Sequence, residues 1–177
     1  MKGTVLRATV VVLFLSLMAC SGGMSTWYHV PAQIPPANNV FEIHAPYNDV
    51  WKAAVQVYAN RNINIKTIEK ESGLIASDRM ILPESKFMKY MNPGTYKTAA
   101  GLRTKPTSPM LYSNLFIEKV SKDETILRVN LRGTVQWSIS SSGSAYKPAP
   151  ELGITECQST GVLEASFFQE IQNRCLK

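Results

Sequence analysis

The stretch TILRVNLRGTVQWSI, residues Thr125–Ile139, decides the fold because it alternates more clearly than any other part of the chain. Apolar side chains occupy every second position, as on an antiparallel strand with one buried and one wet face. We expect the buried face to carry Leu127, Val129, Leu131, Gly133, Val135, Trp137 and Ile139. The wet face would carry Arg128, Asn130, Arg132, Thr134, Gln136 and Ser138. Gly133 predicts a bend or a bulge.

The segments that flank this strand extend the sheet and supply two helices. Residues 110–120 predict a partner strand, and residues 40–44, 63–69 and 74–82 predict three more. A helix opens at Ala45–Pro46, since proline is tolerated at the start of a helix. A second helix begins at about Thr160, after a Ser/Gly/Pro loop at 140–150. Each helix has an apolar stripe at helical spacing.

This order predicts an α+β fold, in which an antiparallel sheet of about five strands carries two helices on one face. We expect residues 40–177 to form this single domain, a helix-grip-like sandwich. Such a sandwich either encloses a cavity or has a filled core. The bulk of Trp51, Trp137, Phe167 and Phe168 favours a filled core.

The start of the chain predicts export and acylation. Lys2 and Arg7 precede an apolar run that ends in Leu17-Met18-Ala19-Cys20, and this run is too short to remain as a membrane span. We expect residues 1–19 to be a cleaved signal and Cys20 to receive the lipid of a bacterial lipobox. The alternative is an ordinary signal peptide with a chance cysteine.

Residues 20–39 predict a tether between the acylated cysteine and the domain, because glycines and prolines prevent regular structure there. Trp27 and Tyr28 would contact the membrane interface or the domain, or else form a docking motif. In a Gram-negative cell, Ser21 rather than aspartate after Cys20 favours the outer membrane, facing the periplasm. Acyl chains would hold the protein there.

Two features now suggest a resemblance. The lipobox with its Pro-rich tether, followed by FEIHAPYNDVWKAAVQVYANRNINIKTIEKESGLIASD (41–78), resembles the helix-grip domains of the C-component lipoprotein of the β-barrel assembly machinery. The closing ECQSTGVLEASFFQEI is similar to the end of small outer-membrane lipoproteins. The resemblance implies a fold and a location. Membership of that machine does not follow, since this chain has one such domain and a short tether.

Three cysteines occur, and Cys20 is assigned to lipid. Cys157 and Cys175 either pair in the oxidising periplasm or stay as two separately buried thiols. A straight helix over 161–174 would hold the two thiols about 20 Å apart, which argues against pairing.

The candidate partner-binding surface is a long basic loop at 83–110, which holds many prolines and glycines and shows no period. Loops of this length are usually functional or disordered. Basic, aromatic and methionine side chains alternate in it, which suits a protein partner or an anionic envelope polymer; the alternative is a mobile solvated loop. The candidate residues are Lys86, Phe87, Lys89, Tyr90, Tyr96, Lys97, Arg103 and Lys105.

Arg128 and Arg132 form the candidate anion-binding pair, because they share the wet face of one strand. A solvated sheet face is the alternative interpretation. His29 and His44 are the only histidines, and without a Cys/His cluster they predict no metal site.

The function predicted from these observations is that of a non-enzymatic, lipid-anchored accessory subunit of an outer-membrane complex. The formal net charge falls from +6 to +4 once Lys2 and Arg7 are removed, which does not suggest nucleic acid. We expect no cofactor. The alternative function is the binding of a lipid or small amphiphile between the sheet and the last helix. An enzyme is the third option, although Ser144 and Lys147 are the only motif-like pair.

Overall fold

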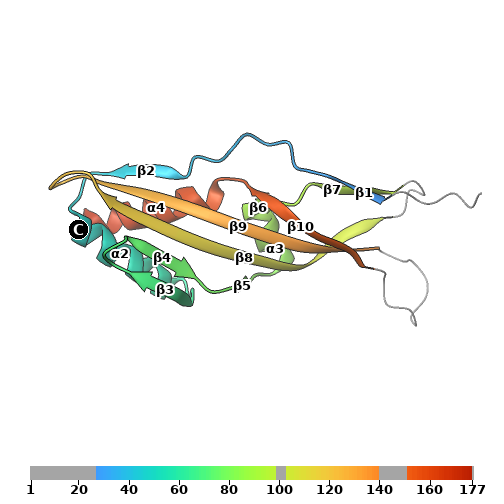
Figure 1. Cartoon of the computed structure of the whole chain (residues 1–177), viewed down its shortest axis with the longest axis horizontal. Coiled ribbons are helices and arrows are strands. Elements are labelled where there is room, and N and C mark those ends of the chain that lie inside the picture. The colour runs from blue at the N-terminus through green and yellow to red at the C-terminus, as the bar shows by residue number, and fades with distance from the viewer. Residues whose placement is uncertain (1–26, 99–102, 140–150, 177) are drawn as a thin grey trace, which may run out of the picture.

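The computed structural model describes residues 27–98, 103–139 and 151–176, and it shows an α+β fold with three helices and a large antiparallel sheet in these parts of the chain (Figure 1). The first elements are β1 (Trp27–Val30), β2 (Val40–Ile43), α2 (Tyr47–Asn60), β3 (Ile65–Glu69), β4 (Leu74–Ser77) and β5 (Met80–Ile81). They are followed by α3 (Glu84–Tyr90), β6 (Met91–Asn92), β7 (Thr95–Thr98), β8 (Thr104–Lys119), β9 (Thr125–Ile139), β10 (Glu151–Ser159) and α4 (Val162–Cys175).

The hairpin of β8 and β9 runs along the long axis of the molecule (Figure 1). The alternation predicted for β9 is confirmed along most of the strand: Leu127, Val129 and Val135 are fully buried, while Arg128 and Arg132 are exposed. The prediction is wrong at Ser138, which was assigned to the wet face and is buried. β8 begins at Thr104 rather than at residue 110, because the pairing continues past a bulge. The bulge lies in β8, between Thr107 and Met110, and not at Gly133.

The sheet is larger than predicted, with eight strands rather than about five. β9 pairs with β2 along its first residues and with β10 along its second half, while β8 pairs with β4 and β5. β10 was not predicted, because a register shift between Glu151 and Gly153 interrupts its alternation. β3 and β6 lie at the two ends of the strand order.

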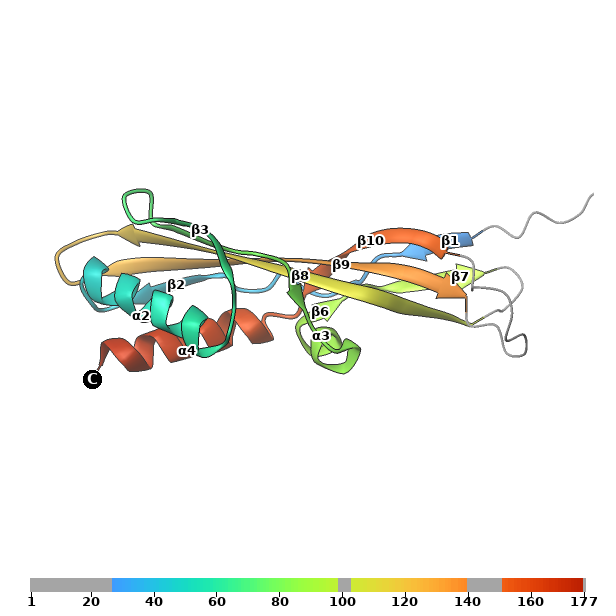
Figure 2. The same ribbon diagram turned by 90° about the horizontal axis from the view of Figure 1, so that it is seen from below.

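α2 and α4 cover one face of the sheet, as predicted, and pack against each other (Figure 2). Between them and the strands lies a filled core that includes Val57, Tyr58, Phe167 and Ile171, each with no exposed surface. Arg61 ties the two helices together: its Nε donates to Glu170 at 2.9 Å and its guanidinium lies 4.6 Å from the centre of the Phe167 ring.

The prediction of a loop at 83–110 is wrong over most of its length. Its described part forms α3, β6, β7 and the first residues of β8. Pro83 precedes α3 and supplies its N-cap backbone, and Phe87 and Met91 are fully buried against the sheet. The segment lacks a period because it changes from helix to strand within a few residues.

The tether prediction is also wrong from residue 27 onward. β1 pairs with β7, and His29 and Tyr96 lie with Trp137 in one aromatic cluster, with ring centres 5.5 to 6.4 Å apart. Residues 31–39 then run beside the sheet from β1 to β2 (Figure 1). The Val129 N–H donates to the Asn39 carbonyl at 2.8 Å. Pairing of β1 with β7 places the backbone of Trp27 and Tyr28 on the domain, while contact of their side chains with the membrane interface and a docking motif both stay predictions.

Candidate functional site

The face of the sheet opposite α2 and α4 carries the candidate functional site, which we call the outer face. It is formed by side chains of β8, β9 and β10 that alternate with the buried ones. Its members are Met110, Tyr112, Asn114, Phe116, Arg128, Asn130, Arg132, Thr134, Ile154 and Glu156. One open depression lies on it toward the middle of the sheet, and a second lies at its edge, where the end of β8 meets the start of α2.

The central depression has a volume of about 620 Å³ and is lined by Tyr112, Asn130, Arg132 and Ile154, among others. Ile154 is 65% exposed although it lies in a strand. Arg132 donates to Glu156 on the neighbouring strand at 2.6 Å. Because both partners of this ion pair are exposed, it contributes little to stability. Its charges remain accessible to a partner.

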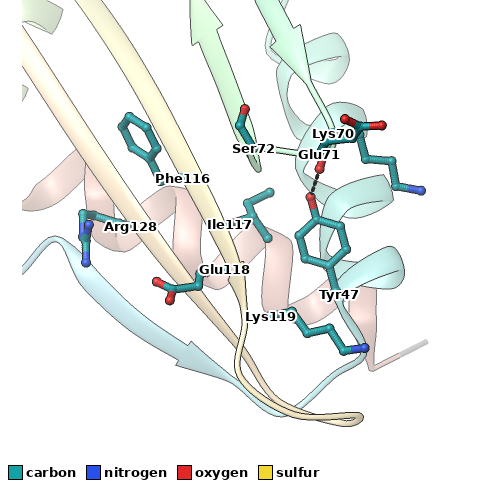
Figure 3. Close-up of a pocket in the computed structure, with 9 residues that line it drawn as sticks. All are labelled: Tyr47, Lys70, Glu71, Ser72, Phe116, Ile117, Glu118, Lys119 and Arg128. Atoms are coloured by element: carbon teal, nitrogen blue, oxygen red, sulfur yellow. Dashed lines mark hydrogen bonds between the residues drawn. The ribbon is translucent and has the colours of Figure 1, made fainter.

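The second depression, of about 710 Å³, lies between the end of β8 and the β3–β4 turn (Figure 3). Arg128 and Phe116 form one side of it, and Tyr47 and the turn form the other. The Tyr47 hydroxyl donates to the Lys70 carbonyl, which ties the first turn of α2 to the turn between the strands. Burial raises the pKa of Tyr47 above its ordinary value.

The predicted anion pair, Arg128 and Arg132, shares one face as expected but does not converge on one site. Arg128 lines the second depression and Arg132 lines the central one. Pairing of Arg132 with Glu156 further reduces the local positive charge. A single anion gripped by both guanidinium groups is therefore not supported by this geometry.

The predicted partner-binding residues divide into two groups. Lys86 and Lys89 on α3, and Lys97, Arg103 and Lys105 at the β1–β7 end, are exposed. Phe87 is fully buried, and Tyr90 and Tyr96 pack against the core. Tyr96 also donates to the Leu152 carbonyl at 3.2 Å. The prediction that Phe87 belongs to a contact surface is wrong, because its side chain has no exposed surface. Tyr90 and Tyr96 are half-buried and help to hold residues 84–98 on the sheet.

The two cysteines of the domain are free thiols in the structure, so the disulfide alternative is not observed. Cys157 lies on β10 and Cys175 is the last residue of α4. Burial and the neighbouring Glu156 raise the pKa of Cys157 to about 12, and burial and Asp49 raise that of Cys175. Cys20 and the Ser144–Lys147 pair lie outside the described residues, as do the signal and the 140–150 loop.

Two buried polar groups were missed by the sequence analysis. Tyr58 has no exposed surface, and its hydroxyl lies 2.9 Å from Ser113 Oγ, while the Ser113 N–H donates to Ser77 Oγ at 2.8 Å. Desolvation raises the pKa of Tyr58 to about 12. Glu164, in the first turn of α4, is 2% exposed and accepts a hydrogen bond from Ser159, while its second oxygen has no partner. In the sequence, Tyr58 fits the apolar stripe of its helix and Glu164 fits the acidic first turn of its helix. Neither residue therefore stands out as a buried polar group.

No three His, Cys, Asp or Glu side chains are grouped within metal-binding reach in residues 27–98, 103–139 and 151–176. No helix of the same ranges has both the length and the apolar character to cross a bilayer.

The sequence contains a signal for the outer face in the alternation of residues 110–116. Met110, Tyr112, Asn114 and Phe116 alternate on the strand that pairs with Thr125–Ile139, so they must share the face of its arginines. No protein-family model and no curated protein matches the chain.

Proposed function

We propose that the protein is a non-enzymatic, lipid-anchored envelope protein that binds a partner protein through its outer face, as an accessory subunit of an outer-membrane complex. The observation that carries the proposal is the outer face itself. The three described helices lie on the other side of the sheet (Figure 2). The outer face nevertheless carries Phe116 at 37% exposure and Ile154 at 65% exposure.

The composition of the outer face favours a protein partner. Aromatic residues, methionine and arginine are enriched in protein interfaces, and Tyr112, Phe116, Met110 and the two arginines supply all of these. Asn114 and Asn130 face each other across β8 and β9, and Asn114 offers an amide donor and acceptor between the apolar side chains. Asn130 Oδ1 already accepts from Asn39 Nδ2 at 2.8 Å, which leaves its amide N–H groups as donors. The two depressions are open, which suits protruding side chains of a partner better than an enclosed small molecule.

The lipid anchor of the proposal rests on Leu17-Met18-Ala19-Cys20, and the outer membrane on Ser21. Acyl chains on Cys20 would confine the domain to one membrane surface, and confinement raises its effective concentration toward a partner in that membrane.

Binding of an amphiphile between the sheet and α4 is not favoured by any observation. Leu127 and Val129 on β9 and Phe167 and Ile171 on α4 fill that space and are fully buried.

The proposal is tested by placing a photo-crosslinking amino acid at Tyr112 or Asn130 in the full chain in living cells. Lys52, which is exposed on α2 at the other side of the domain, is the matched control position. We expect one discrete protein adduct from both outer-face positions and none from Lys52. The adduct should decrease severalfold when Arg132→Glu is added. Adducts that are absent, or equal at position 52, would rule the outer face out as the contact surface.

A further inference from the structure

The end of the molecule formed by β1, β7 and the start of β8 carries a cluster of exposed basic side chains, which we call the basic tip. It consists of Lys97, Arg103 and Lys105, with Tyr28 beside them. Tyr28 is 55% exposed and is the cross-strand neighbour of Lys97. Both views place β1 and β7 at the end of the long axis opposite α2 and α4 (Figures 1 and 2).

The basic tip also contains β1, the described element that lies nearest to Cys20 along the chain. β1 begins at Trp27, so residues 21–26 separate the cysteine from the two-stranded sheet of β1 and β7. An extended residue spans at most about 3.6 Å, which limits the distance from Cys20 to Trp27 to about 25 Å. Pairing of β1 with β7 therefore fixes which end of a long domain lies near the anchor.

The other end of the long axis has a different charge. The β8–β9 turn and the residues beside it carry Lys119 and Lys122 together with Glu118, Asp123 and Glu124. Among the described residues at the basic tip, the three cations share this end with one acidic residue, Glu151, at the start of β10. In the register of the sheet, Lys105 on β8 and Glu151 on β10 both pair with Ser138, so their backbones lie on opposite sides of β9.

We propose that the basic tip binds the anionic phospholipid headgroups of the membrane that holds Cys20. This inference rests on the proposed acylation and deepens it by giving the domain an orientation. A basic side chain near an anionic leaflet strengthens binding by about fivefold. Tyr28 and Trp27 have amphipathic rings of the kind that settles at a membrane interface, and they are the residues that enter the domain from the anchor.

The orientation has a consequence for the outer face. With the basic tip on the membrane, the long axis of β8 and β9 points away from it, and the two depressions are presented at increasing distance from the lipid. A partner would then contact the outer face from the side, without competing with the membrane for the same residues.

The inference is tested with the acylated full chain reconstituted in vesicles of phosphatidylethanolamine and phosphatidylglycerol, using a phospholipid that carries a photoactivatable headgroup. Crosslinked residues are mapped by mass spectrometry. Lys97→Glu/Arg103→Glu is the test variant, and Lys119→Glu/Lys122→Glu is the matched control with the same charge change at the other end. Thermal unfolding of both variants checks that each is folded.

We expect crosslinks at residues 27–30 and 95–105 that fall by fivefold or more in the test variant and stay unchanged in the control. The crosslinks of the parent protein should fall to the same extent when phosphatidylcholine replaces phosphatidylglycerol. Crosslinks that are concentrated at residues 118–124, or that ignore both the variant and the lipid charge, would overturn the orientation. Incorporation of labelled palmitate is measured in the same samples. If palmitate is incorporated, misplaced crosslinks overturn the orientation alone; if it is not incorporated, the anchor itself has failed.

Discussion

Gly133 on β9 lies directly against the side chain of Met91. A methyl group on its α-carbon would lie 2.8 Å from Met91 Cε and 3.1 Å from Phe87 Cζ. Gly133 is therefore a site of close approach, which lets α3 and the residue after it pack on the sheet.

Replacing Gly133 by alanine should lower the free energy of unfolding by about 1–3 kcal/mol, because the added methyl group overpacks this contact. Denaturant unfolding measures the change. Thr134→Ala, one residue along and on the outer face, is the control and should change stability by less than half as much. Equal effects at the two positions would show that residues 84–91 do not pack on Gly133.

The buried hydroxyl of Tyr58 provides a second test of the core. Tyr58→Phe removes its bond to Ser113 and leaves a buried serine without that partner, so we expect a loss of about 1–2 kcal/mol of stability. Tyr28→Phe, at an exposed position, should change stability by only a few tenths of a kcal/mol. A neutral Tyr58→Phe would mean that water or another group satisfies Ser113.

Glu164 predicts a pH dependence of stability. Desolvation raises the pKa of its carboxyl in the folded state above the value in the unfolded chain. Ionisation therefore costs more in the folded state, so stability is full at acid pH and falls as the pH rises from the ordinary glutamate range through the raised pKa.

Glu164→Gln should remove this loss and make the protein more stable than the parent at neutral pH, with little difference below the ordinary pKa. Thermal unfolding across the pH range measures the effect, and Glu118→Gln at an exposed position is the control. If the parent and Glu164→Gln have parallel stability profiles, the carboxyl is not held in an apolar site.

The thiols of Cys157 and Cys175 should remain reduced and react slowly. Their raised pKa values leave little thiolate at neutral pH, and the thiolate is the reactive form. Titration of thiols with a coloured disulfide reagent should therefore count both only after unfolding in denaturant. Absence of both thiols from the denatured, unreduced protein would show that a disulfide forms.

The sequence predicted those elements in which apolar and polar side chains recur with a regular period. The period of Thr125–Ile139 and the stripe from Val50 to Tyr58 predicted β9 and α2, because each segment has one buried face along its whole length. Residues 84–98 were misassigned because a seven-residue helix and two short strands leave too few repeats for any period. Their burial depends on Gly133, about forty residues further along the chain.

The candidate site was predicted only in part for a similar reason. The arginines of the outer face were recognised on one strand, whereas Ile154 joined them only once β10 was known to pair with β9. The basic residues at 97–105 were recognised as a surface, but their place at the end of the long axis depends on the pairing of β1 with β7. No local pattern in a four-residue strand specifies such a distant partner.

The central claim is that acyl chains on Cys20 hold this domain at a membrane. The most direct measurement is the mass of the N-terminal peptide of the mature protein purified from membranes. We predict a chain that begins at residue 20 and carries a diacylglyceryl group and an amide-linked fatty acid on the cysteine. A mature chain that begins elsewhere, or a cysteine of unmodified mass, would contradict the account.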